Sequence, residues 1–326
     1  MNPYIGHDTQ ICGIEEHRLL GGKGDGMRLL EVRNGRGLAF TVSADRCADI
    51  SRLTFGGVNC GYFAPCGYVS PAYYEREGAG FLNSFTAGFF TTCGLTTVGA
   101  PGEDGDEHLP LHGTISNTPC ETISWRQDGE DIVIEATVID ARLFGRKLKL
   151  RREIRCSNVL NTLTLRDEIT NEGDEESPIM VLYHINIGYP LLSEAACLNI
   201  PSSRVAPRDA RAAEGLESWN ALLPPTPGFT EQCYYHSFHG ERGSASVWNP
   251  AAGCGLEIQF DTRSLDHFTQ WKQMGVRDYV LGLEPGNCGP EGRLKARENR
   301  YLKTLLPGDK ATYGWQARFF SEPNVK

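Results

Sequence analysis

The feature of this sequence that most restricts its fold is a succession of short segments in which apolar and polar residues alternate. The clearest of these segments span residues 27–46, 131–140, 160–173 and 255–262. Alternation with a period of two residues places every second side chain on one face of a β-strand. Dipeptides such as Asn34-Gly35 and Asp128-Gly129 predict tight turns between strands. We therefore expect an all-β protein with many antiparallel strands, arranged as a large sandwich or barrel.

Helical signals are weak along the whole chain, and the best candidate, residues 70–77, is short. Residues 201–229 are rich in Ala, Pro, Arg and Glu and have the weakest strand pattern. We interpret them as a long connection across the surface, because strand-like sequence of the same kind resumes after them. A single domain spanning residues 1–326 is the resulting prediction.

The formal net charge of -9 argues against a nucleic acid or an anionic membrane as a partner. The only dense basic run, residues 146–155, alternates with leucines and predicts a strand with one solvated face. No apolar stretch approaches the ~18–20 residues that span a bilayer, and the N-terminal residues lack a secretory signal. We expect a cytoplasmic protein.

Eleven cysteines are present, an odd number with irregular spacing and no CxxC pair. Most, such as Cys93 and Cys254, lie in apolar or Gly-rich surroundings that are typical of small buried residues. The pattern predicts free thiols in a reducing compartment and gives no zinc motif. His108 lies among acidic residues in a loop that could hold a metal ion, but such loops are usually only solvated. We predict no metal site.

Three polar residues stand out because each lies at or beside the end of an apolar, strand-like run. They are His112 in HLPLHGTISNTP, His184 in IMVLYHINIGYP and Glu284 in YVLGLEPGN. Burying an unpaired imidazole or carboxylate costs several kcal/mol, so such groups persist mainly where they have partners or a chemical role. Two imidazoles and one carboxylate predict a general acid–base site.

Each of these residues also has a structural alternative. His184 could be a core histidine that donates to a backbone carbonyl, and His112 could be a satisfied loop residue beside Gly113. Glu284 could face solvent at a strand end, which is the usual position of glutamate.

Other polar residues could bind a substrate or serve the fold. Arg46 could clamp hydroxyls or a carboxylate, or pair with a nearby aspartate, and Asn117 could cap a turn. Gln270, Trp271 and Lys272 combine a stacking surface with hydrogen-bond donors, which suits a sugar, although a tryptophan in a strand usually packs in the core. GGKGDG at residues 21–26 lacks the phosphate-loop spacing and reads as a hairpin loop, and no GxSxG elbow is present.

Six segments, in order along the chain, carry a resemblance to one protein family. The segments are SADRCADI, TTCGL, LHGTISNTP, LYHINIGYP, TQWKQ and LGLEPGN. In them the chain resembles the aldose 1-epimerase, or galactose mutarotase-like, proteins, and within these a divergent bacterial branch that carries a domain of unknown function (DUF4432-like). The resemblance runs from about residue 46 to the end, and it implies a β-supersandwich of two large twisted antiparallel sheets with a sugar site on a concave face.

The resemblance also implies roles for individual residues. His184 matches the general acid toward the sugar ring oxygen, Glu284 matches the general base toward the anomeric hydroxyl, and His112 matches the histidine that orients the sugar. The catalytic roles reverse when the ring closes from its other face, so the implied mechanism needs no cofactor or metal.

The chain departs from the family pattern in the residues that would read the sugar hydroxyls. Typical members carry an early Asn-Arg pair, where this chain has Arg46 and Asp49. Their substrate-binding aspartate has no clear match; Glu231 is the best positional candidate and His236 is its rival. The expected substrate-binding set is completed by Asn117, Gln270 and Lys272.

The leading prediction is therefore a carbohydrate mutarotase that acts on a small-molecule sugar, as a monomer or homodimer. One alternative is an epimerase or isomerase of a keto sugar or uronate, in which Glu284 removes a carbon-bound proton and Arg46 or Lys272 binds a carboxylate. Another is a carbohydrate-binding protein that uses the fold without catalysis.

Overall fold

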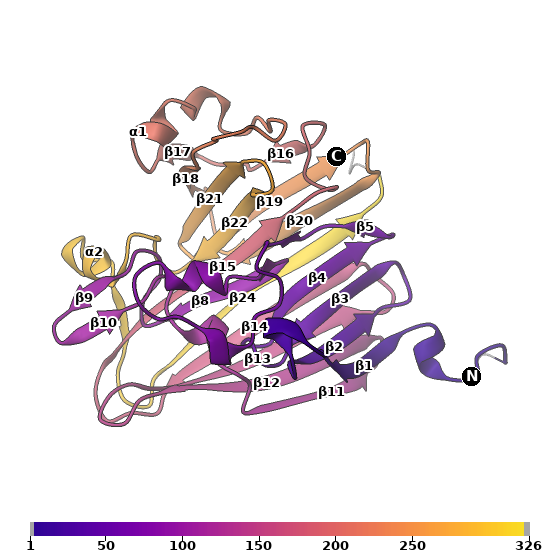
Figure 1. The fold of residues 1–326 in the computed structure, drawn as a ribbon, viewed down its shortest axis with the longest axis horizontal. Helices are drawn as coiled ribbons and strands as arrows, with labels where there is room; N and C mark the ends of the chain where they lie inside the picture. Colours follow the sequence, from indigo (N-terminus) through magenta and orange to yellow (C-terminus); the bar gives the residue numbers. More distant parts are fainter. Residues whose placement is uncertain (1–2, 323–326) are drawn as a thin grey trace.

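The structure is a computed structural model, and it describes residues 3–322. The main elements of the fold are two large antiparallel sheets, of 12 and eight strands, that lie face to face (Figure 1). Short segments connect the strands, and helices are few and short. The all-β prediction is confirmed.

The first sheet has ten strands in a continuous order and two short strands that pair at its side. In spatial order they are β1 (Gly13–Arg18), β2 (Arg28–Arg33), β3 (Leu38–Ser43), β4 (Asp49–Phe55), β8 (Phe90–Leu95), β15 (Ser177–Ile187), β22 (Tyr279–Gly286), β21 (His267–Met274), β18 (Gln232–Ser237) and β17 (Arg204–Pro207), with β5 (Val58–Asn59) beside β4 and β23 (Lys303–Leu305) beside β15.

The second sheet is built from the middle and the end of the chain. Its order is β11 (Thr122–Asp128), β12 (Asp131–Ala141), β13 (Lys147–Ser157), β14 (Thr162–Asn171), β24 (Lys310–Phe320), β20 (Cys254–Asp261), β19 (Arg242–Asn249) and β16 (Cys197–Asn199). Both sheets therefore combine strands from the N-terminal and C-terminal halves, so neither half forms a sheet alone.

Small elements complete the described part of the chain. Two-stranded ribbons pair β6 (Tyr62–Phe63) with β7 (Ala87–Gly88) and β9 (Gly102–Asp104) with β10 (Glu107–Leu109). The helices are α1 (Ala210–Ala213) and α2 (Arg293–Glu298), with 3-10 turns η1 (Asp8–Gln10), η2 (Gly22–Gly24), η3 (Pro71–Tyr73), η4 (Gly80–Asn83), η5 (Ile115–Asn117) and η6 (Leu216–Ser218). Within residues 3–322, no helix has the length and apolar character that crossing a membrane requires.

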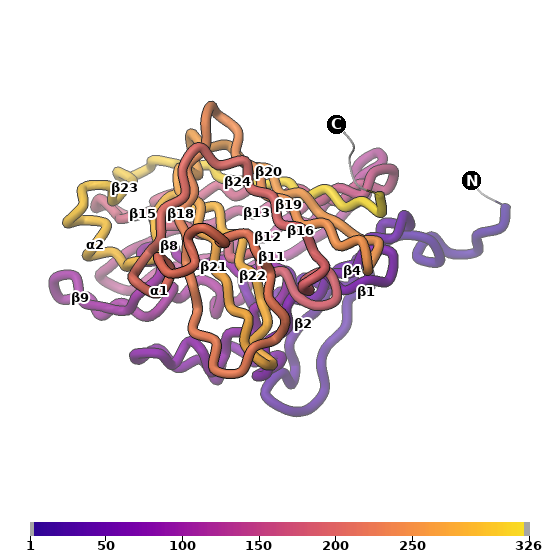
Figure 2. Tube along the Cα trace, turned by 90° about the horizontal axis from the view of Figure 1, so that it is seen from above, coloured from indigo at the N-terminus to yellow at the C-terminus, as the bar shows by residue number. Residues whose placement is uncertain are grey.

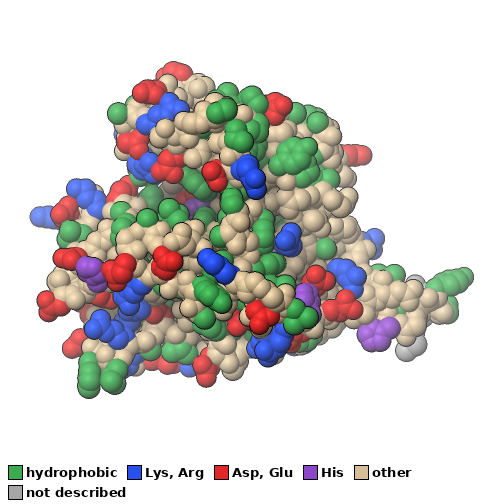
Figure 3. All heavy atoms as spheres, in the orientation of Figure 1, with side chains coloured by type: hydrophobic (Ala, Val, Ile, Leu, Met, Phe, Trp, Pro, Cys, Tyr) green, Lys and Arg blue, Asp and Glu red, His purple; other side chains and the backbone are tan. Residues whose placement is uncertain are grey.

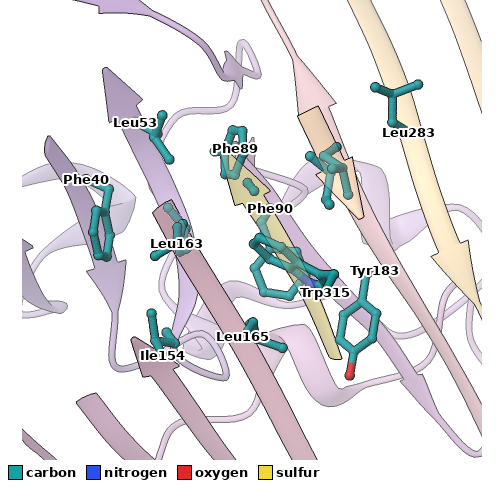
Figure 4. Packing of buried hydrophobic residues seen from close by; sticks show 14 of the residues in the cluster. Phe40, Leu53, Phe89, Phe90, Ile154, Leu163, Leu165, Tyr183, Leu283 and Trp315 are labelled. Carbon is teal, nitrogen blue, oxygen red and sulfur yellow. The ribbon is translucent and has the colours of Figure 1, made fainter. Parts of the chain in front are cut away.

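The hydrophobic core lies between the two sheets. Phe40, Leu53 and Phe90 from the first sheet meet Leu165 and Trp315 from the second (Figure 4). The alternating segments explain this arrangement: β12, β13 and β14 bury every second residue along most of their length. Burial of apolar area in this layer is the main favourable term for folding.

A charge cluster of three buried residues, Arg152, Asp167 and Asp49, interrupts this core. Arg152 of β13 lies on the buried face of its strand, and its side chain is 0% exposed. It donates to both oxygens of Asp167 at 2.9 and 2.7 Å and to Asp49 at 2.8 Å. Residues 146–155 thus form a strand with one solvated face, as predicted, but one of their arginines points inward because two buried carboxylates balance its charge.

Two local expectations need correction. Residues 201–229 do form a surface connection, but they also contain the edge strand β17, which pairs with β18. Residues 70–77 contain only the single turn η3. The connection that carries α1 lies beside β18 and β21 (Figures 1 and 2). All eleven cysteines are free, which agrees with the prediction of free thiols.

Candidate active site

A pocket of about 420 Å³ opens on the face of the first sheet that points away from the second sheet. Figure 3 shows this side of the molecule hollowed below the lobe that carries α1, with hydrophobic side chains around the hollow. Five strands or strand ends and several loops supply its walls. The lining residues are Phe81, Leu82, Phe85, Gly99, Ala100, Pro101, Leu111, His112, His184, Arg208, Glu231, Cys233, Thr269, Trp271, Glu284 and Pro290.

The register of three central strands brings the polar residues of the pocket floor into one row. Thr269 of β21 lies opposite Glu284 of β22. Ile185 of β15 lies opposite Leu283 of β22, which places His184 beside Glu284. The preceding residue of β15, Tyr183, points into the core, so His184 points into the pocket.

His184 and Glu284 form a buried pair. Nε2 of His184 is 3.3 Å from Oε1 of Glu284, and the side chains are only 6% and 3% exposed. The two groups are not aligned as a hydrogen bond in this geometry. Burial lowers the pKa of His184 to about 3 and raises the pKa of Glu284 well above its usual value. Both shifts favour the uncharged forms, a neutral imidazole and a protonated carboxyl group.

His112 reaches the same floor from a loop. Its backbone has φ 58°, in the left-handed region that residues other than glycine rarely adopt. Two backbone hydrogen bonds hold this conformation: the amide of Gly94 donates to its carbonyl at 3.0 Å, and its own amide donates to Gly99 at 2.9 Å. The ring centroid lies 5.8 Å from that of His184. Burial lowers the pKa of His112 to about 4, so its ring is neutral at neutral pH.

A glycine makes room for the carboxylate of Glu284. Gly282 lies opposite Trp271 in the strand pairing and two residues before Glu284 on the same face. A Cβ at this position would overlap Oε1 of Glu284 and would lie 2.9 Å from Cβ of Trp271. The missing side chain thus allows both groups to fold over the sheet.

Arg208 and Glu231 form a second polar group on the pocket wall. Nη2 of Arg208 donates to Glu231 at 2.8 Å and Nε donates to Asp209 at 2.8 Å, while Nη1 contacts Sγ of Cys233 at 3.0 Å. The other oxygen of Glu231 accepts from Nε1 of Trp271 at 2.6 Å. Glu231 is thus the one member of the expected substrate-binding set that lines the pocket. Arg208 was not anticipated, because it follows β17 in the segment with the weakest strand pattern.

Gln270 and Lys272 lie on the opposite face of their strand from the pocket. Thr269 and Trp271 of β21 line the pocket, so the residues between and after them point the other way. Lys272 donates to the carbonyl of Ser218 at 3.3 Å, and burial lowers its pKa to about 8. The alternation along the strand therefore places both residues outside the pocket, which corrects the prediction that they bind substrate there.

His236 is a buried residue on the same far side. One ring nitrogen lies 2.7 Å from Oγ of Ser202, and the other lies 3.0 Å from Oε1 of Gln270. Gln270 in turn donates to the carbonyl of Trp219. These contacts tie the residue 201–229 connection to the sheet, so His236 supports the fold instead of lining the pocket.

Arg46 also lies outside the pocket, where it binds backbone groups of other segments. Its buried guanidinium donates to the backbone carbonyls of Val69, Ser84 and Ser116. These carbonyls belong to segments that cover the first sheet, so Arg46 anchors the segments that flank η4 and include η5.

Asp49 and Asn117 are the remaining predicted substrate-binding residues that lie outside the pocket. Asp49 is buried beside Arg152 and accepts from the amide and hydroxyl of Thr92. Asn117 ends η5 and accepts a long hydrogen bond of 3.4 Å from Ser84. Neither residue lines the pocket.

The acidic loop around His108 gives no metal site in the described residues. His108 lies 3.1 Å from Glu103 and 3.5 Å from Glu77, and its side chain is 64% exposed. Within residues 3–322, no group of three or more His, Cys, Asp or Glu side chains is arranged to hold a metal ion.

Comparison with solved structures shows the same architecture in known proteins. A "putative aldose 1-epimerase" from Klebsiella pneumoniae subsp. pneumoniae MGH 78578 is 28% identical, with a TM-score of 0.86 over 94% of this chain and 83% of that chain. A galactose mutarotase-like protein from Clostridium acetobutylicum is 13% identical, with a TM-score of 0.65 over 95% of this chain and 99% of that chain. The galactose 1-epimerase from Lactobacillus acidophilus NCFM is 16% identical, with a TM-score of 0.62 over 94% of this chain and 98% of that chain. The predicted galactose mutarotase-like fold is confirmed.

The sequence comparison identifies the family. No curated protein matches the sequence. The family model described as a domain of unknown function, DUF4432, matches residues 24–318. The chain therefore belongs to the DUF4432 family, with the fold of the galactose mutarotase-like proteins.

Proposed function

We propose that this protein is a carbohydrate mutarotase, which interconverts the anomers of a sugar by opening and reclosing its ring. The observation that carries the proposal is the buried pair in which Nε2 of His184 lies 3.3 Å from Oε1 of Glu284 on a pocket floor. Two proton-transfer groups at this separation can act on two oxygens bound to one carbon. The neighbouring His112 is neutral and supplies a further hydrogen-bonding nitrogen. The aldose 1-epimerase name of the Klebsiella protein supports the same assignment.

The proposed reaction begins with the single proton that the pair holds. It moves from Oε1 of Glu284 to Nε2 of His184, which gives a carboxylate base and an imidazolium acid. Glu284 then accepts the proton of the anomeric hydroxyl while His184 donates its proton to the ring oxygen. The bond from C1 to the ring oxygen breaks, its electron pair stays on the ring oxygen, and O1 becomes the aldehyde oxygen. Rotation about C1–C2 and the reverse proton transfers give the other anomer.

NMR anomer-exchange spectroscopy on aldoses, ketoses and uronates tests the proposal directly. We expect exchange of at least one sugar to be faster with the protein than in buffer alone, and to scale with protein concentration. A heat-denatured sample is the control for buffer catalysis. Tight binding of a sugar with exchange at the uncatalysed rate would instead favour a carbohydrate-binding protein.

A uronate substrate has less support from the pocket. It would need a cation that is free to bind its carboxylate, but Arg46 and Lys272 do not line the pocket. Arg208 does line it, but its charge is already balanced by Glu231 and Asp209. A neutral sugar therefore fits the pocket better, with Arg208 donating to a hydroxyl oxygen and Glu231 accepting from a hydroxyl.

Gly282→Ala is expected to slow anomer exchange by about 10²-fold, because the new methyl group displaces the carboxylate of Glu284, and misplacement by about 1 Å costs that much. The loss should appear mainly in kcat. Gly102→Ala, which has no atom within 4 Å of its added Cβ, is the matched control. In a Glu284→Gln background the same change should cause little further loss; an equal further loss would show that Gly282 acts in another way.

The pH dependence of kcat/KM is expected to have its acid limb near pH 4. Burial lowers the pKa of His184 to about 3 and that of His112 to about 4, whereas an ordinary histidine titrates near ~6.5. As the pH falls, His112 is protonated near pH 4 and His184 near pH 3. Once His184 carries a proton of its own, it cannot take the proton of Glu284, so Glu284 can no longer form the carboxylate base. The measurement is exchange rate against pH, with circular dichroism at each pH to confirm folding. An acid limb near ~6.5 would contradict the assignment.

A further inference from the structure

The proposed roles of His184 and Glu284 fix the direction in which a bound sugar points. The ring oxygen is bonded to two carbons, C1 and C5, and the anomeric hydroxyl is bonded to C1. With Glu284 at the anomeric hydroxyl and His184 at the ring oxygen, C5 and its substituent lie beyond His184 on the side away from Glu284. The carbon C2 is bonded to C1, so it lies nearer the Arg208–Glu231 side of the pocket than C5 does.

The pocket wall beyond His184 is apolar. It consists of Phe81, Leu82, Phe85 and Leu111, which we call the apolar wall. The ring of Phe85 lies 5.3 Å from that of His184, and 5.1 Å from that of Phe81. Phe81 and Phe85 pack in one hydrophobic cluster, and Leu111 packs against it.

Polar partners for a C5 substituent are scarce on this side. His112 is the polar side chain within this part of the described lining, with its ring 5.3 Å from that of Phe81. The family resemblance implies that His112 orients the sugar ring, so we assign its nitrogen to the ring. Phe81 and Phe85 are only 1% and 9% exposed, so the hydroxyl of a CH₂OH group that packs against them would lose water without gaining a partner, which is unfavourable. A methyl group at the same position would fill the apolar wall.

We propose that the substrate is a 6-deoxyhexose, a sugar with a methyl group on C5, in preference to the hexose that carries a CH₂OH group there. This inference rests on the proposed mutarotase function and adds the substrate class. In this proposal the Arg208–Glu231 group hydrogen-bonds the ring hydroxyls, and the apolar wall packs against the methyl group on C5. An apolar pocket that meets an added hydroxyl discriminates by up to about 10²-fold, so we expect a preference of about 10- to 100-fold in kcat/KM.

Matched pairs of sugars that differ only at O6 test the inference. Anomer exchange is measured for D-galactose and D-fucose, D-glucose and D-quinovose, L-mannose and L-rhamnose, and L-galactose and L-fucose. In the configuration that the enzyme accepts, the 6-deoxy sugar should react faster at low concentration. An equal or faster hexose would overturn the substrate class and leave the mutarotase proposal standing. No acceleration with any sugar would overturn both.

Binding to the Glu284→Gln variant gives a readout that does not depend on catalysis. NMR titration should show tighter binding of the 6-deoxy member of the preferred pair, and equal affinities would count against the apolar wall as a specificity element.

A wall variant tests whether these residues carry the preference. Leu82 is 59% exposed, so Leu82→Gln should fold and would offer a hydrogen-bond partner to O6. We expect it to narrow the preference several-fold by improving the hexose. Leu294→Gln on α2, at 46% exposure and outside the pocket, is the matched control and should leave the preference unchanged. An unchanged preference in Leu82→Gln together with equal binding would overturn the proposal.

Discussion

Replacing Glu284 with Gln is expected to slow anomer exchange by about 10²–10⁴-fold, which is the usual contribution of one well-placed proton-transfer group. The amide keeps the size of the side chain but cannot accept the anomeric proton as a carboxylate does. Because burial already raises the pKa of Glu284, the neutral amide should not weaken the fold. The unfolding free energy should stay unchanged or rise, so loss of exchange in a well-folded variant would be chemical in origin.

His184→Gln should have an effect of similar size, and the two changes should not add. In the proposed reaction the two groups, 3.3 Å apart, exchange one proton, so either change would disable the pair. The double variant should be about as slow as the slower single variant. Glu298→Gln, on the exposed surface of α2, is the control and should keep wild-type exchange. Independent, multiplicative losses would mean that the two residues act in separate steps.

The fold could be predicted from the sequence because its main determinant is local. Each alternating segment specifies a strand with one apolar face, and burial of those faces requires two sheets. The order of strands in the sheets could not be predicted this way. The pairing of β15 with β8 and β22 depends on tertiary contacts between residues far apart in the chain.

The candidate catalytic residues could be singled out in the sequence because ionisable side chains are unexpected within apolar strands. His184 and Glu284 interrupt runs that are otherwise apolar, which marks them in the sequence. Alternation also determines that Trp271 and Lys272 face opposite sides, so applying the period of two within that strand separates the pocket residues from the others. His112 is different: a loop conformation held by distant backbone groups brings it to the floor.

The rest of the pocket depends on contacts that leave no local pattern. Arg208 follows a short edge strand with little alternation, and its position depends on tertiary contacts such as the ion pair with Glu231, which immediately precedes β18. Arg46 has the hydrogen-bonding groups to bind a substrate, but its guanidinium donates to three backbone carbonyls from other segments. Sequence alone cannot distinguish an arginine that meets a ligand from one that meets the backbone.

Arg152→Met is expected to lower the unfolding free energy by about 3–5 kcal/mol at neutral pH, the usual result when one partner of a buried ion pair is removed. The change leaves the carboxylates of Asp49 and Asp167 in the core without their cation. Because Tyr183 donates to Asp167 at 2.8 Å and precedes His184, the variant should also disturb the pocket floor. The measurement is denaturant unfolding followed by circular dichroism.

The pH dependence of this loss identifies its cause. Burial already raises the pKa of Asp49, and removal of Arg152 would raise it further. The carboxyl group of the folded variant therefore keeps its proton at pH values where that of the unfolded chain, with an ordinary pKa of ~3.9, has lost it. The loss relative to wild type should therefore be largest at neutral pH and should shrink toward pH 4. Arg155→Met, on the same strand with its side chain 32% exposed, is the control and should cost less than about 1 kcal/mol. A loss of unfolding free energy in Arg152→Met that does not vary with pH would point to lost packing instead of unbalanced charge. It would then contradict the explanation that this arginine is retained in the core to balance Asp49 and Asp167.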